Sequence, residues 1–201
     1  MLRGMNQPEE PHPAAVDAVR MRLRALADAA GVPEPVLRVD VPRREDRLPH
    51  VREIDGHRTV VVPRSLLEAQ PARQLWELAA CLGRWTSPVP DQRRRISGIV
   101  LAVVLAVLVA LIIIRPTSWI WITPILLYPI GSWLLRWERR AMDDAGRQIL
   151  ARAGHRPAEI ARQAFGSEAS PPAIRALLTA EPSPQSRIIA AETDRRTDPA
   201  A

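Results

Sequence analysis

The chain has 201 residues, a length typical of one compact domain or of one small domain with membrane segments. All 28 basic residues are Arg, against 22 acidic residues, but they are spread along the chain without clustered aromatic residues, so we expect no nucleic-acid partner. The single Cys excludes an internal disulfide, and nothing in the composition requires an oxidising compartment.

A helix and a strand are predicted first along the chain. Residues 1–12 are polar and rich in Pro and Glu, which predicts a disordered tail without the apolar core of a secretory signal. Apolar residues at spacings of three and four then predict a helix ending at Gly31. They are Val16, Val19, Leu23, Leu26 and Ala30. Alternation of apolar and charged residues over 36–41 predicts a half-buried strand.

A hairpin and a second helix follow. Asp55-Gly56 indicates a turn between strands at 51–54 and 58–62. The second helix is predicted from about Pro71 to Trp85, and its apolar face carries Leu75, Leu78, Leu82 and Trp85. At about 100° per residue, Ala80 and Arg84 share the opposite face, one turn apart.

The middle of the chain predicts a transmembrane hairpin over 96–137, with spans at about 96–114 and 118–135. Arg residues precede the first span and follow the second, whereas the connecting turn holds only Arg115. This charge distribution predicts a multi-pass protein of a bacterial inner membrane with both termini cytoplasmic. Neither span holds a carboxylate, which argues against a channel or transporter.

Small residues recur at four-residue spacing in the first span, at Gly98, Ala102, Ala106 and Ala110. Such a small-residue stripe allows close approach of another helix backbone. We expect a helix-packing seam against the second span, and the alternative is a seam for a second copy or a protein partner.

Five segments in order carry a resemblance to a known family. They are 29–35, 58–68, the helix around Ala80, 140–145 and 180–188. Over roughly residues 15–191 the chain resembles the membrane zinc metallopeptidases of the HtpX and CAAX-prenyl-protease type. The resemblance implies an α+β, mainly helical fold: a zincin-like (gluzincin) cytoplasmic domain with a small strand hairpin, interrupted by the transmembrane hairpin. It places the two halves of that domain at 13–92 and 138–190. The polar composition of 191–201 predicts a second disordered tail.

The residues that would carry the family's chemistry are replaced. The family has a His-Glu-x-x-His helix and a later glutamate as third zinc ligand. The resemblance places Ala80 and Arg84 at the two histidines and Cys81 at the general-base glutamate. The third ligand corresponds to Arg140, or to Arg139 if the register differs by one. Alanine has no donor atom and arginine stays protonated, so we expect no zinc, no other cofactor and no catalytic residue.

Other residues offer no replacement chemistry. The four histidines, His12, His50, His57 and His155, show no ligand spacing with one another. Cys81 has no neighbouring histidine to activate it as a nucleophile.

The resemblance also suggests an anion site. It brings Arg84 close to Arg140, or to Arg139, where the family binds zinc, and two buried guanidinium groups need an anion between them. The anion is either a local carboxylate, from Glu138, Asp143 or Asp144, or a ligand: an acidic peptide, a chain terminus or an anionic lipid headgroup.

The sequence therefore predicts a catalytically inactive, peptidase-like membrane protein that acts as a binding, scaffold or regulatory subunit at the cytoplasmic membrane face. Its expected partners are membrane lipid and a protein partner or a second copy of the chain. Two alternatives remain: an active membrane metallopeptidase with non-standard ligands, and a structural membrane subunit of a larger complex.

Overall fold

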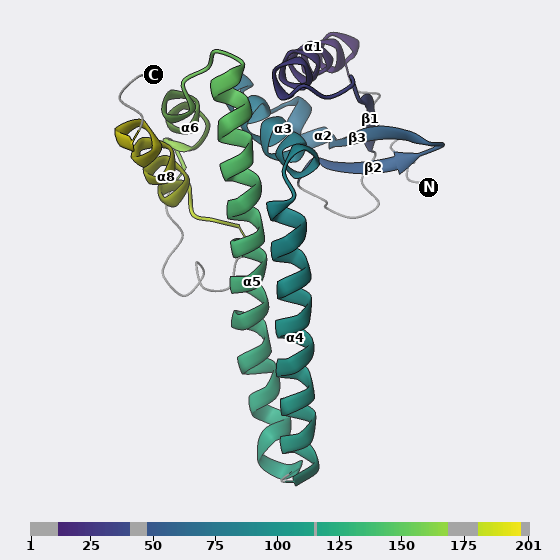
Figure 1. Ribbon diagram of the computed structural model, residues 1–201, viewed down its shortest axis with the longest axis vertical. Coiled ribbons are helices and arrows are strands. Elements are labelled where there is room, and N and C mark those ends of the chain that lie inside the picture. The colour runs from purple at the N-terminus through teal and green to yellow at the C-terminus, as the bar shows by residue number, and fades with distance from the viewer. Residues whose placement is uncertain (1–11, 41–47, 115, 169–180, 198–201) are drawn as a thin grey trace, which may run out of the picture.

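In the computed structural model, the residues described are 12–40, 48–114, 116–168 and 181–197. The fold is mainly helical with one three-stranded sheet, which confirms the coarse fold class. A head of short elements sits at one end of a long pair of helices (Figure 1). The elements are α1 (Pro13–Ala30), β1 (Val36–Asp40), β2 (His50–Ile54), β3 (His57–Pro63), α2 (Arg64–Leu67), α3 (Pro71–Thr86), α4 (Val89–Ile114), α5 (Pro116–Arg152), α6 (Pro157–Phe165) and α8 (Pro184–Thr197).

The sheet has the strand order β1-β3-β2, with β1 parallel and β2 antiparallel to the central β3. The predicted hairpin is confirmed, because β2 and β3 pair directly and enclose Asp55 and Gly56. Both turn residues have positive φ, 52° and 74°, as a two-residue turn with the twist of a hairpin requires. The predicted strand at 36–41 is also confirmed, as β1, which pairs with the other edge of β3.

Helix α1 confirms the first predicted helix. It begins with Pro13, whose missing amide proton costs nothing in the first turn, and ends at Gly31 with φ of 68°. Of the predicted apolar face, Val19, Leu23 and Leu26 are buried and Val16 and Ala30 are partly buried, and Ala27, which was not predicted, is buried as well. This face packs into the main hydrophobic core together with α3 and the sheet.

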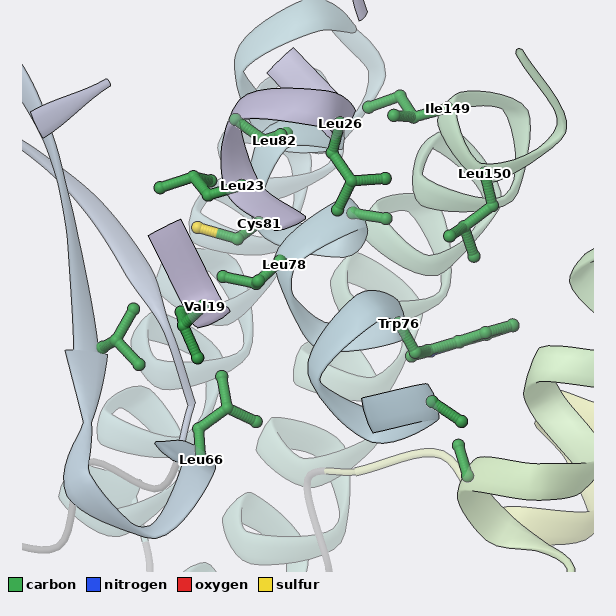
Figure 2. Close-up of a cluster of buried hydrophobic side chains, with 14 of the residues drawn as sticks. Val19, Leu23, Leu26, Leu66, Trp76, Leu78, Cys81, Leu82, Ile149 and Leu150 are labelled. Atoms are coloured by element: carbon green, nitrogen blue, oxygen red, sulfur yellow. The ribbon is translucent and has the colours of Figure 1, made fainter. Parts of the chain in front are cut away.

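Helix α3 lies at the centre of the head and is buried almost all round. The predicted apolar face is confirmed, since Leu78 and Leu82 are fully buried and Leu75 and Trp85 pack against the core (Figure 2). The opposite face, which carries Ala80, is buried as well. It is covered by α5, which packs along α3.

Helices α4 and α5 run side by side in opposite directions (Figure 1). Within the described residues, α4 is the one helix long and apolar enough to cross a membrane. Only Pro90 and Leu108 of α4 are buried, so it is not the core helix of a soluble domain. Much of the predicted second span, at 116–122 and 124–126, lies outside the residues whose side chains the structure describes.

The small-residue stripe of α4 does not face the described part of α5. All four of its residues are exposed, and a side chain built on Gly98 would meet no atom within 4 Å. The residues of α4 that are less exposed include Ser97, Val104 and Leu108, whose side chains are larger than those of the stripe. A seam for a second copy or a partner stays a prediction.

The C-terminal boundary differs from the prediction. Helix α8 continues to Thr197, past the expected start of a disordered tail at residue 191. Ala191 is buried in the core cluster, so α8 has a packed face despite its polar composition. The predicted N-terminal tail, apart from His12, lies outside the described residues.

Candidate functional site

The helix that carries Ala80 and Arg84 makes backbone contact with α5. A side-chain carbon built on Gly146 would lie 2.7 Å from the Ala80 nitrogen, and one on Gly83 would lie 2.8 Å from Ala145 Cβ. Both distances are too short for any residue but glycine, which lets two backbones approach this closely. The two helices are therefore in direct contact at Ala80 and Gly83, where the resemblance places the metal-binding turn.

Cys81, at the general-base position, lies in the hydrophobic core. It clusters with Leu23 and Leu78 between α1 and α3 (Figure 2). Burial raises the pKa of the Cys81 thiol to about 12, and the nearby guanidinium of Arg139 only partly opposes that rise. A buried neutral thiol is neither a nucleophile nor a metal-binding thiolate, as expected for a packing residue.

Arg84 takes a partner other than the expected ones. Its Nε lies 3.5 Å from Asp91 Oδ1 at the start of α4, and its side chain is partly exposed. Arg140 is exposed and lines a pocket in which Arg84 takes no part. The expectation that these two guanidinium groups share one anion is therefore not met.

Of the two residues proposed for the third-ligand position, Arg139 is the one that faces α3. Its guanidinium is buried and donates a hydrogen bond to the Glu77 carboxylate of α3. Its Nε lies 3.8 Å from Asp143 Oδ1, one turn further along α5. A local carboxylate thus neutralises this arginine, and Asp143 is one of the three acidic residues expected to do so.

One further residue, Arg187, completes what we call the buried charge cluster: Glu77, Arg139, Asp143 and Arg187. Arg187 of α8 donates from Nε to Asp143 Oδ2 at 3.1 Å and from Nη1 to Glu77 Oε1 at 3.4 Å. The indole of Trp76 donates to the other oxygen of Asp143 at 3.2 Å. Two carboxylates and two guanidinium groups balance in charge, so the cluster needs no external ion.

The electrostatics keep Arg139 positively charged. Burial alone would lower the pKa of Arg139, but the carboxylates of Glu77 and Asp143 outweigh it and raise that pKa. Burial raises the pKa of Asp143, and the guanidinium groups of Arg187 and Arg139 oppose that rise. Each charge thus depends on its opposite neighbours, and removing one would leave another buried without compensation.

A pocket of about 500 Å³ opens between α5 and α8, beside the buried charge cluster. Figure 1 shows α8 next to α5, above the long helical pair. The pocket is lined mainly by cationic, acidic and aromatic side chains, among them Arg93, Trp137, Arg140, Asp144, Arg147 and Arg187.

Sequence reasoning missed Glu77, Arg187 and Arg93 as site residues. Glu77 stands three residues before Ala80 and therefore on the same side of α3, a signal that could have indicated a partner for Arg139. Arg187 belongs to the segment 180–188 that carries part of the resemblance. Nothing local in the sequence places Arg93 beside Arg140, because the two lie on different helices.

The zinc ion that the resemblance implies does not fit these residues. Ala80 offers only a methyl group, and Arg84 and Arg139 are cations already paired with carboxylates. Within the described part of the chain, no three side chains from His, Cys, Asp and Glu gather closely enough to hold a metal ion. The histidines are scattered over the cap of α1, the strands β2 and β3, and the loop after α5.

Comparisons with models of protein families, with curated proteins and with solved structures find no match to this chain.

Proposed function

We propose that this protein is a catalytically inactive, peptidase-like membrane protein that serves as a binding or scaffold subunit at the cytoplasmic face of a bacterial inner membrane. The observation that carries the proposal is the contact between α3 and α5 at Ala80 and Gly146. Where a metallopeptidase needs metal ligands and an open coordination position, this chain has a methyl group and two backbones in contact.

The membrane location is supported by α4. Its side chains include many exposed large apolar residues, such as Ile99, Val103 and Val107, which water would disfavour. Arg93, Arg94 and Arg95 precede this apolar stretch on the side expected to be cytoplasmic. In the proposal, α5 returns through the membrane, and both termini lie in the cytoplasm.

The relation to metallopeptidases is supported by the way distant segments meet. The segment 180–188 contributes Arg187, which binds Asp143 of the helix after the apolar region. The same helix turns Arg139 toward α3, which carries the substituted His-Glu-x-x-His positions. A chance resemblance of short segments would not be expected to bring three of them into one cluster.

Metal content and proteolysis test the proposal together. We expect plasma mass spectrometry of the detergent-purified chain to find far less than one zinc per chain, and casein to remain uncleaved. About one zinc per chain, lost on replacing one of the four histidines with alanine, would instead support an active metallopeptidase with non-standard ligands.

A second candidate is a structural membrane subunit that contacts its partner through the small-residue stripe. The exposure of that stripe on α4 favours it. Replacing Ala102 and Ala106 with leucine would disrupt such an assembly. The corresponding control is leucine at Val103 and Val107, which are exposed on the same helix outside the stripe.

A further inference from the structure

We propose that the pocket between α5 and α8 binds the headgroup of an anionic phospholipid. This inference rests on the proposed membrane location but not on the loss of peptidase chemistry. It concerns the side of α5 that faces α8, which borders the buried charge cluster at Asp143 and Arg187.

The pocket carries more positive than negative charge. Among the described residues, four arginines line it against two acidic residues, Asp143 and Asp144. Asp143 binds Arg187, and Asp144 Oδ1 lies 3.0 Å from Arg147 Nη2, so each acidic residue already has a cation. The two remaining arginines are Arg93 and Arg140.

Neither remaining arginine has a carboxylate partner among the described residues. Arg93 donates to the Trp137 carbonyl oxygen at 3.0 Å, and its guanidinium lies 5.1 Å from the centre of the Trp137 ring. Arg140 is exposed and forms no ion pair within the described part of the chain. Two cations at one pocket attract a group with at least one negative charge, and phosphate oxygens suit the planar guanidinium fork.

A third, buried arginine, Arg187, lines the same pocket with its charge paired but with one hydrogen-bond donor unmet within the described part of the chain. The side chain of Arg187 is only 3% exposed, yet its Nη2 has no hydrogen-bond acceptor among the described residues. A buried donor without an acceptor is costly.

The position of the pocket argues for a lipid rather than a free anion. Arg93 and Trp137 stand at the ends of the two apolar stretches, at the depth where headgroups lie in the proposed orientation. The Trp137 ring stacks on that of Trp133, with centres 6.4 Å apart, and Trp133 is exposed. Indole rings favour this interface, and they offer apolar surface next to the charged pocket. A phospholipid matches both the charged pocket and the apolar indole surface beside it, whereas inorganic phosphate matches only the charged pocket.

The test compares lipid classes on the full chain in a mild detergent. Dioleoyl phosphatidylglycerol and dioleoyl phosphatidylcholine are titrated separately, and bound lipid is counted by native mass spectrometry. We expect preferential binding of phosphatidylglycerol. At about 1 kcal/mol for each arginine near an anionic surface, the double variant Arg93→Gln/Arg140→Gln should lose roughly 10- to 30-fold in affinity.

The matched control is Arg94→Gln/Arg95→Gln, which removes the same charge from exposed positions on α4 that do not line the pocket. This variant should keep the preference. An equal loss in both double variants would overturn the proposal in favour of general surface attraction. Complete competition by inorganic phosphate, or tighter binding of a poly-glutamate peptide, would also overturn it. If the double pocket variant unfolds, Arg140→Gln alone is used in its place, because Arg140 is exposed, and its affinity for phosphatidylglycerol is compared with that of the control.

Extraction of membranes with alkaline carbonate separates this inference from the proposed function. A chain released by carbonate would contradict the membrane location itself. A chain that stays in the membrane fraction but shows no preference for phosphatidylglycerol would contradict only the pocket.

Discussion

Two faces of α5 differ in burial and in charge, although neighbouring residues of the helix, Arg139 and Arg140, belong to different faces. One face, with Arg139 and Gly146, packs against α3 and is buried, and Asp143, which pairs with Arg139, lies at its border and also lines the pocket. The other, with Arg140 and Arg147, borders the pocket beside α8. The first balances its charges internally, whereas the second has cations in excess.

The difference shows where a ligand can bind in this protein. At the buried face, backbone contact and paired charges leave neither space nor net charge for a ligand. At the pocket, there is a volume of about 500 Å³ and two arginines that have no carboxylate partner in the part of the chain that the structure describes. We therefore expect the residues that the resemblance places at zinc-peptidase positions to be structural, and we expect a ligand to bind in the pocket between α5 and α8.

The largest effect is expected from breaking the buried charge cluster. Glu77→Ala would leave Arg139 buried without its main partner, which typically costs about 3–5 kcal/mol. Chemical or thermal unfolding monitored by circular dichroism measures this loss. Glu68→Ala is the control, because Glu68 forms an exposed pair with Arg64 that contributes less than about 1 kcal/mol. Equal losses in the two variants would contradict the assigned role of the cluster.

A smaller effect is expected at the helix contact itself. Gly146→Ala would force α5 away from Ala80, at a cost of about 1–3 kcal/mol for an overpacked contact. Gly98→Ala is the control, because a side-chain carbon there meets no atom within 4 Å. If Gly146→Ala proved as stable as the wild type, the close contact of α3 and α5 would be wrong.

The buried thiol predicts a pH dependence at the same face. The pKa of Cys81 rises from 9.0 in the unfolded chain to about 12 in the folded one, so the unfolded chain releases the proton first. The neutral Cys81 thiol makes its full contribution to the free energy of unfolding below about pH 9, and this contribution is lost as the pH rises toward 12. The expected loss is about 1 kcal/mol between pH 9 and pH 10.

In Cys81→Ala, the free energy of unfolding should fall less steeply between pH 9 and pH 10 than in the wild type, whatever the stability of the variant at neutral pH. Because the chain has one Cys, alkylation provides a second measurement: iodoacetamide at pH 8 should label the unfolded chain and spare the native one. Rapid labelling of the native chain would contradict the burial of Cys81.

The smallest effect is expected at Arg84. Its pair with Asp91 is partly exposed, so Arg84→Gln should change stability by less than about 1 kcal/mol. It should also leave phosphatidylglycerol binding unchanged, because Arg84 does not line the pocket. A large loss of lipid binding would show that the two faces of α5 are less separate than described.

Local patterns predicted the elements of the head well. Helix α1, the β2–β3 hairpin and α3 follow from apolar spacing and from the Asp55-Gly56 turn, which depend on neighbouring residues only. The tail after residue 190 was misjudged because its composition is polar on average, whereas one side of α8 is buried at Ala191.

The candidate site depends on contacts between distant residues, which local patterns do not encode. Arg139 meets Glu77 across 62 positions, and Arg187 meets Asp143 across 44. The periodicity of α3 placed Ala80 opposite the apolar face, but it could not show that α5 covers that face. For the same reason, the sequence placed Arg140 next to Arg84, whereas in the structure Arg140 lines a pocket with Arg93 and without Arg84.

Native mass spectrometry of the chain purified in mild detergent from its own membrane tests both faces of α5 in one spectrum. We predict a metal-free chain that carries an anionic phospholipid, with the lipid lost from Arg93→Gln/Arg140→Gln and kept by Arg94→Gln/Arg95→Gln. A zinc-bound mass, or a lipid adduct that survives in the pocket variant as well as in the control, would contradict the account.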